Sequence, residues 1–324
     1  MYKSEELLKK VNEALDGLTY DRKPSSLYEP IKYVLAIGGK RVRPVLMLLA
    51  YNLFKDDPLR IMTQAIGLET YHNFTLLHDD VMDNAPMRRG HQTVHEKWDA
   101  NTAILSGDTM LVTAYQHIAR CPSDKLPEVI DLFTKTALEI DEGQQYDVEF
   151  ESRDDVTEAE YIEMIRLKTS VLLACALKMG ALLAGASEQD ARLLYRFGEN
   201  IGLAFQLQDD YLDVYGDPAT FGKRIGGDIL SNKKTYMLIN ALLKADDTQR
   251  RELDRWIHAE QYDPEEKISA VTRLYNEMGI DLLAQEKINY FFDQGKTLLD
   301  AVSVSEERKQ ELRAYVARMM KRNK

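Results

Sequence analysis

The chain has 324 residues and a mass of 37.2 kDa, enough for a large hydrophobic core, and 44 % hydrophobic with 29 % charged residues is typical of a globular protein. The net charge of −11 argues against nucleic acid as a partner, because phosphates attract basic surfaces. Two cysteines, Cys121 and Cys175, exclude a disulfide framework and a Cys-rich zinc site. The charged N-terminus is unlike a signal peptide, and no apolar run approaches the ~18 residues of a membrane span, so we expect a cytoplasmic protein.

Apolar residues recur at helical spacing along most of the chain, first at Leu7, Val11 and Leu15. Short breaks follow at residues 38–39, 84–90, 121–122, 216–218 and 226–227. A capping-box pattern at Thr157 predicts a helix as far as Leu183. A similar signal at Ser187 predicts a helix as far as Asp213.

Strand patterns bounded by hairpin turns are absent from the sequence, and only 17 Gly and 9 Pro are available to form turns. No Ser-, Gly- or Pro-rich linker divides the chain. We therefore predict an all-α fold in which residues 1–324 form a single domain. About ten to twelve helices in one large bundle would surround a deep central cavity.

Two acidic clusters stand on otherwise apolar helices. In Asp79-Asp80-Val-Met-Asp83 and in Asp209-Asp210-Tyr-Leu-Asp213, the first and last Asp are four residues apart and share one helix face. Like charges so close are unfavourable unless a divalent cation neutralises them, and carboxylate oxygens suit Mg²⁺. Acidic pairs elsewhere, such as Asp154-Asp155, look like solvated surface. Two such clusters facing each other would suit a Mg²⁺-bound diphosphate.

Basic residues adjoin both clusters. Gly38-Gly39-Lys40-Arg41-Val42-Arg43 leads from a turn into a helix start, where backbone N–H groups also favour anions. Arg88-Arg89-Gly90 follows the first cluster, and Lys223 and Lys233 follow the second. Each of these side chains alone is typical of a solvated charge. Their shared position beside the acidic clusters favours a diphosphate site.

These motifs, in this order, resemble those of the trans-isoprenyl diphosphate synthases of the polyprenyl synthetase family. The resemblance runs from Gly38 to about Thr235 and includes, besides the clusters above, Gly143-Gln144 with Asp147, Lys168-Thr169, Gln206, and Lys233 with Thr235. It implies an isoprenoid-synthase helical bundle that acts as a homodimer. The implied reaction is head-to-tail condensation of isopentenyl diphosphate with an allylic diphosphate, with release of diphosphate.

The resemblance also implies roles for individual residues. Mg²⁺, expected as three ions with the allylic diphosphate bound and replaceable by Mn²⁺, would be held by Asp79, Asp83 and Asp209, with Asp80, Asp210 and Asp213 completing the clusters. The allylic diphosphate would be bound by Arg88, Lys168, Lys223 and Lys233, and isopentenyl diphosphate by Lys40, Arg43, His72 and Arg89. At a kink in the helix, Thr169 and Gln206 would stabilise the allylic cation. The departing diphosphate would remove the proton.

Residues upstream of Asp79 on its helix predict the product length. Tyr71, Thr75 and Asp79 are spaced by one turn, so Tyr71 lies about 12 Å from Asp79 along the axis. Small Thr75 would leave the path of the growing chain open, Phe74 would narrow it and Tyr71 would close it. This pattern resembles geranylgeranyl (C20) diphosphate synthases, with farnesyl diphosphate (C15) as the alternative product; Tyr71 and Phe74 as ordinary core residues are the alternative interpretation.

Two other classes of protein are weighed against the synthase. A terpene cyclase shares the ionisation chemistry but has no need of the Lys40, Arg43 and Arg89 site and normally has a mixed Asn/Ser/Glu second motif. A regulatory subunit of a heteromeric synthase tends to lose one acidic cluster, whereas this chain has both.

Overall fold

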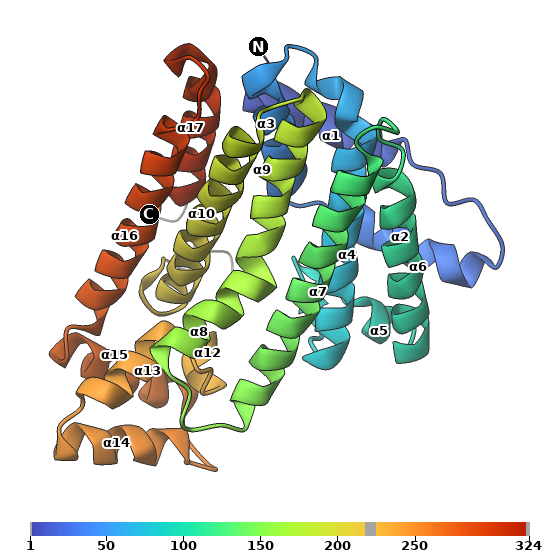
Figure 1. Ribbon diagram of the computed structural model, residues 1–324. Coiled ribbons are helices and arrows are strands. Elements are labelled where there is room, and N and C mark those ends of the chain that lie inside the picture. The colour runs from blue at the N-terminus through green and yellow to red at the C-terminus, as the bar shows by residue number, and fades with distance from the viewer. Residues whose placement is uncertain (1, 218–224, 322–324) are drawn as a thin grey trace. The chain divides into compact units, whose positions relative to one another are not determined.

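The computed structural model describes residues 2–217 and 225–321, and these residues are helical almost throughout (Figure 1). The predicted all-α fold class is confirmed. The structure has more helical segments than the ten to twelve expected, because some helices are only one turn long and the predicted 158–183 helix is divided. The chain falls into two compact units, and the single domain and its central cavity stay predictions.

The first unit contains residues 1–134, 176–192 and 303–312. Its elements before residue 120 are α1 (Ser4–Asp16), α2 (Ser25–Ala36), α3 (Val42–Phe54), the 3-10 turn η1 (Pro58–Ile61), α4 (Met62–Met82), β1 (Met87–Arg88), β2 (His91–Gln92), α5 (Val94–Lys97) and α6 (Ala100–Ile118). The helices α4 and α6 lie side by side (Figure 1). The apolar helix α3 is buried along most of its length, so its first turn, which carries Arg43, is firmly anchored.

The second unit contains residues 135–175, 193–302 and 313–324. It includes α8 (Glu158–Ile165), the π-helical turn η2 (Arg166–Ser170), α12 (Gly227–Leu230), α13 (Tyr236–Lys244), α14 (Asp247–Ile257), α15 (Pro264–Glu277) and α16 (Ile280–Asp300). Four of the five unit boundaries fall within further helices, α7 (Leu126–Glu151), α9 (Val171–Ala184), α10 (Glu188–Tyr215) and α17 (Glu306–Lys321).

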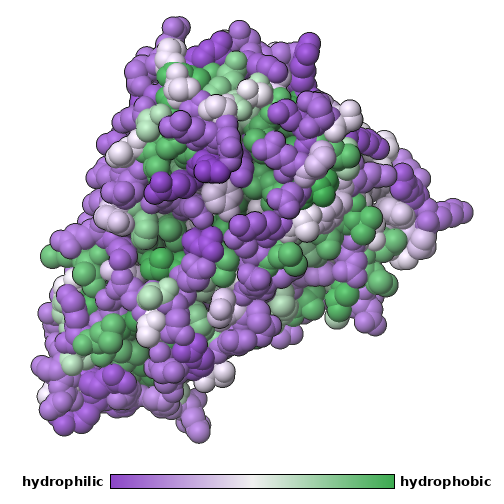
Figure 2. Space-filling model, in the orientation of Figure 1, coloured by the Kyte–Doolittle hydropathy of each residue, from purple (hydrophilic) through white to green (hydrophobic). Residues whose placement is uncertain are grey.

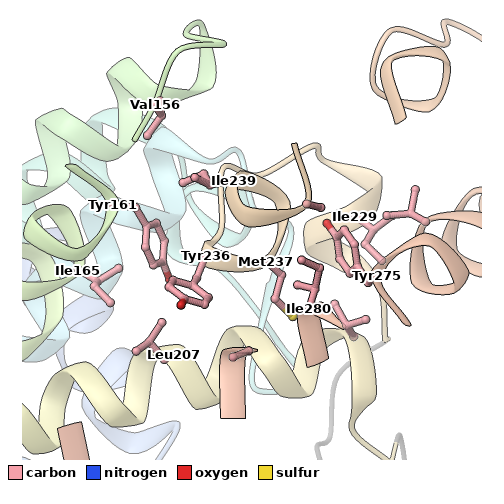
Figure 3. Close-up of a cluster of buried hydrophobic side chains, with 14 of the residues drawn as sticks. Val156, Tyr161, Ile165, Leu207, Ile229, Tyr236, Met237, Ile239, Tyr275 and Ile280 are labelled. Atoms are coloured by element: carbon pink, nitrogen blue, oxygen red, sulfur yellow. The ribbon is translucent and has the colours of Figure 1, made fainter. Parts of the chain in front are cut away.

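A cluster of buried apolar side chains forms the core of the second unit (Figure 3). Figure 3 shows Tyr161 and Ile165 of α8 beside Leu207 of α10 and Tyr236 of α13. This packing fixes the part of α10 that carries the second acidic cluster against α8.

Both predicted helix starts are confirmed. The Thr157 side chain accepts from the N–H of Glu160, whose carboxylate accepts from the N–H of Thr157 at 2.9 Å. The Ser187 hydroxyl accepts from the N–H of Asp190 at 3.1 Å. The helices then extend to Ala184, with one π turn, and to Tyr215.

The stretch Glu158–Ala184 is long and apolar enough to cross a membrane by length and composition alone, although charged residues near its start interrupt its apolar run. Of its most apolar window, 83 % is buried inside the protein. Such burial is typical of the core helix of a globular protein.

Candidate active site

The first acidic cluster lies at the C-terminal end of α4. Asp80 is buried, and burial raises its pKa above the ordinary value although Arg88 opposes the shift. The Arg88 guanidinium donates to Asp80 Oδ1 at 2.7 Å and to Asp79 Oδ2 at 3.5 Å. Asp83 is exposed one turn after Asp79. The structure therefore brings together the two carboxylates and the arginine that the motifs predict as neighbours.

Arg88 comes from a short hairpin that sequence patterns missed. Its strands β1 and β2 have two residues each and pair antiparallel, with Arg88 opposite His91. The turn between them contains Arg89 at φ 51° and Gly90 at φ 77°, and strands of this length leave no alternation to detect. The hairpin holds both arginines beside the end of α4.

The glycine turn before α3 receives Arg89. The Arg89 guanidinium donates to the carbonyl oxygen of Gly38, and a Cβ on Gly39 would lie 2.7 Å from Arg89 Nη1. Gly39 also has φ +153°, a conformation that side chains rarely adopt. Glycine at position 39 is thus required for the turn and the guanidinium to meet.

A buried ion pair anchors the same turn. Arg41, at φ 48°, caps α3 and donates to Glu69 Oε1 at 2.8 Å, and both side chains are only 3 % exposed. Asn73 also donates to Glu69 Oε1, at 3.2 Å. Sequence analysis treated Arg41 only as part of a motif and missed Glu69. The signal that was available is a glutamate among the apolar residues of α4.

Arg43 and His72 are in direct contact, with 3.0 Å between Arg43 Nη1 and His72 Nε2. Burial and the surrounding charges of Arg43, Arg89 and Arg88 hold the pKa of His72 well below its usual range, so the imidazole is neutral at pH 7. Because a guanidinium can only donate, His72 Nε2 accepts and its proton resides on Nδ1. Three of the residues predicted for isopentenyl diphosphate are thus neighbours in the first unit, while Lys40 is exposed.

In the second unit, Lys168 and Thr169 lie in the π turn η2, a departure from regular helix at the point where the kink is predicted. The turn is packed between two glycines. A Cβ on Gly143 would lie 2.3 Å from the backbone nitrogen of Lys168, and one on Gly202 would lie 2.6 Å from Ser170 Cα. Lys168 Nζ donates to Asp147 Oδ2 at 2.5 Å. Burial alone would raise the pKa of Asp147, but Lys233 and Lys168 lower it below its ordinary value.

Thr169, Gln206 and Asp210 form a chain of hydrogen bonds. Thr169 Oγ1 donates to Gln206 Oε1 at 3.2 Å, and Gln206 Nε2 donates to Asp210 Oδ1 at 2.9 Å. The hydroxyl of Tyr161, which sequence analysis missed, donates to Asp210 Oδ2. Burial and the charge of Asp228 raise the pKa of Asp210 to about 7.

The loop after α10 is fastened to the second acidic cluster. Asp213 accepts from the Asp228 N–H at 2.8 Å through its carboxylate and from Gly226 N–H through its carbonyl. Lys233, in this loop, is exposed, whereas Lys267 is 1 % exposed and donates to Asn232 at 2.7 Å. Lys223, predicted for the allylic diphosphate, lies outside the described residues.

The three residues predicted to set product length lie on α4. Tyr71 is 1 % exposed, and its ring centroid lies 5.5 Å from that of Phe74 and 5.1 Å from that of Phe133 on α7. Thr75 is half-buried and donates to the His72 carbonyl at 2.8 Å, so its hydroxyl is satisfied within the helix. Core packing and a tunnel floor both require a buried Tyr71, and its role as a floor stays a prediction.

The predicted metal ligands fit Mg²⁺ by their chemistry. Asp79, Asp83 and Asp209 offer carboxylate oxygens, and the first two stand one turn apart on one helix. Within residues 2–217 and 225–321, no group of three His, Cys, Asp or Glu side chains is placed to hold an ion. The assignment of ligands therefore stays a prediction.

Comparison with known proteins shows the same family as the motifs. The family model for polyprenyl synthetases matches residues 24–277. A geranylgeranyl diphosphate synthase of Methanosarcina mazei is 38 % identical over 295 residues, 90 % of this chain and 89 % of that protein. A geranylfarnesyl diphosphate synthase of Natronomonas pharaonis is 35 % identical over 317 residues, 92 % and 91 % of the two chains.

Among solved structures, the crystal structure of a geranylgeranyl pyrophosphate synthase is 41 % identical, covers 100 % of both chains and has a TM-score of 0.95. The similarity thus extends over the helical fold and well beyond the motifs. The predicted fold class and the predicted enzyme class, a prenyltransferase, are confirmed. The chain belongs to the polyprenyl synthetase family.

Proposed function

We propose that this chain condenses isopentenyl diphosphate with C5, C10 and C15 allylic diphosphates and releases geranylgeranyl diphosphate (C20). The observation that carries the C20 assignment is the order of side chains along α4. Thr75 is small and half-buried one turn before Asp79, and Tyr71 is fully buried one turn deeper. The relatives named geranylgeranyl diphosphate synthases support this product.

Different site residues would bind each of the two diphosphates. Arg88, Lys168 and Lys233 would bind the allylic diphosphate, and Lys40, Arg43, His72 and Arg89 would bind isopentenyl diphosphate. Asp79, Asp83 and Asp209 would hold Mg²⁺, which when bound neutralises charge on the leaving diphosphate. A neutral His72 can accept a hydrogen bond from Arg43 while its Nδ1–H remains a donor. Binding by such side chains suits isopentenyl diphosphate, whose C–O bond must stay intact.

Bond formation needs a stabilised cation and a proton acceptor. The allylic C–O bond breaks, the double bond of isopentenyl diphosphate attacks the cation, and a proton leaves to the released diphosphate. The Thr169 hydroxyl oxygen and the carbonyl oxygen of Gln206 lie within 3.2 Å of each other, and both are dipoles of the sign that favours a cation. Lys168, Thr169 and Gln206 are half-buried, so each keeps part of its side chain exposed.

A homodimer is part of the proposal. On α6, Leu105, Asp108, Thr109 and Val112 repeat at helical spacing, and Leu105 and Val112 are 58 % and 69 % exposed. With Leu27 they line a hollow of about 430 Å³. Figure 2 shows apolar side chains interspersed with polar ones on the surface. A second copy covering this apolar face would remove it from water. The low cysteine content, Cys121 and Cys175 alone, is compatible with the cytoplasmic location proposed for the enzyme.

The test is to incubate the protein with Mg²⁺, isopentenyl diphosphate and one allylic starter at a time, and to size the products by mass spectrometry. A C20 end point from the C5, C10 and C15 starters is expected. A stop at C15, with the C15 starter left unextended, would assign the enzyme as a farnesyl diphosphate synthase with Phe74 as the closure. A C25 product would refute Tyr71 as the floor. No condensation from any starter would refute the synthase and favour a cyclase or a regulatory subunit.

A further inference from the structure

Tyr161 has a buried hydroxyl aimed at the second acidic cluster. The side chain is 1 % exposed, and its hydroxyl donates to Asp210 Oδ2. The other oxygen of the same carboxylate, Oδ1, accepts from Gln206 Nε2 at 2.9 Å. Both oxygens of Asp210 are therefore engaged by donors of the second unit.

From this geometry we infer that Tyr161 is a positioning residue, which acts on the allylic cation through Asp210 and Gln206. The inference rests on the proposed function, because it assigns to Gln206 the stabilisation of that cation. Tyr161 itself contacts Asp210 and would touch neither substrate. It deepens the proposed mechanism by explaining what orients the amide.

The orientation follows from hydrogen-bond chemistry. The group of Gln206 that faces Asp210 is its NH₂, because Nε2 donates to Oδ1 at 2.9 Å, and Oδ1 can accept whether or not the other oxygen of the carboxyl group carries a proton. The amide carbonyl then points the other way, where Thr169 Oγ1 donates to it at 3.2 Å. If Asp210 turned away, the Gln206 amide would lose the contact that distinguishes its two ends. The hydroxyl of Tyr161 holds the carboxylate in place by its second oxygen.

Tyr161 is well placed to fix this carboxylate because its own ring is immobilised. Figure 3 shows the ring beside Ile165, Leu207 and Tyr236 in the buried cluster. The neighbouring Tyr236 is 3 % exposed, and no hydrogen bond of its hydroxyl is found within residues 2–217 and 225–321. Two buried tyrosines of one cluster thus differ in whether they contact Asp210, which supplies a matched control.

The experiment compares Tyr161→Phe with Tyr236→Phe in the full-length protein. Each substitution removes one hydroxyl from the same core. For Tyr161→Phe, kcat is expected to fall about tenfold, with KM for both diphosphates within about twofold of the wild type, as for groups that orient a functional residue. Tyr236→Phe should keep kcat. Thermal unfolding of each variant, and kinetics recorded well below the lower Tm, separate this effect from loss of folding.

A double-mutant cycle tests whether Tyr161 acts through Gln206. Gln206→Leu alone should lower kcat, and adding Tyr161→Phe should lower it no further, since the group that Tyr161 orients is gone. The inference would be overturned if the two reductions in kcat multiplied in the double variant, or if Tyr161→Phe and Tyr236→Phe had equal kcat values. Either result would leave the proposed function intact. Absence of condensation by the wild type would overturn the proposed function and this inference with it.

If Tyr161→Phe fails to fold, Asp210→Asn tests the same orientation of the Gln206 amide. The carboxamide retains the shape of the carboxylate but can present either a donor or an acceptor to Gln206, so the orientation of the amide is no longer imposed. A fall in kcat with unchanged KM is expected. An unchanged kcat would overturn the inference.

Discussion

Replacing Tyr71 by Ala separates a tunnel floor from simple core packing. The side chain is 1 % exposed and packs against Phe74 and Phe133, so its loss should lower the free energy of unfolding by about 3–5 kcal/mol. With an unfolding entropy of about 2.1 cal/mol/K per residue, a chain of 324 residues loses about 4–7 °C in Tm for that change. Both interpretations predict this loss of stability.

The product distinguishes the two interpretations. If Tyr71 closes the path about 12 Å from Asp79, the Ala variant should release products longer than the wild type by one or more C5 units. The assay is mass spectrometry of products from the C15 starter, beside a calorimetric Tm. Tyr51→Ala is the control, because it removes the same side chain, also buried, from α3. Unchanged product length for Tyr71→Ala and for Phe74→Ala, together with the expected drop in Tm, would refute the floor.

Three further changes test other parts of the site. Thr75→Phe should shorten the product toward C15, measured with the C5 and C10 starters; a product of unchanged length would contradict an open path at this position. Glu69→Gln leaves the buried Arg41 without its counter-charge and should lower the free energy of unfolding by about 3–5 kcal/mol in denaturant titrations, and no loss would contradict a native ion pair. Because burial raises the pKa of Asp210 to about 7, its native state holds a proton that the unfolded chain releases near pH 4. Protonated Asp210 should therefore contribute fully to the free energy of unfolding below about pH 4, and this contribution should be lost, by a few kcal/mol, as the pH rises toward 7. In Asp210→Asn, denaturant titrations should no longer show this decrease in the free energy of unfolding between about pH 4 and 7.

The acidic clusters and their helices were predictable because the signal is local. Asp79 and Asp83, or Asp209 and Asp213, lie within one turn of one helix, and helical spacing alone puts them on one face. The two helix starts at Thr157 and Ser187 are equally local, since each cap bonds within three residues.

The roles of Tyr161 and Arg41 could not be predicted, because their hydrogen-bond partners are distant in sequence. Tyr161 bonds to a residue 49 positions away, and Arg41 to one 28 positions away. Neither pairing leaves a periodic trace, and a buried tyrosine is ordinary in a helical core. The hairpin of Arg88 was missed for a different reason. Its two-residue strands are held by a turn in which Arg89 has φ 51°, and amino-acid composition does not reveal such a backbone conformation.

The π turn of residues 166–170 has a consequence for how this sequence can change. It accommodates one residue more than a regular helix, and each residue of a helix advances the chain by about 100° around the axis. Deleting a single residue here would let an unbroken helix form, and the helix on either side would keep its register, because the wide turn is what absorbs the extra residue. The apolar face of α9 would then stay in the core, and only the turn that presents Lys168 and Thr169 would be lost. A one-residue deletion at this point is therefore expected to spare the fold and to change the site.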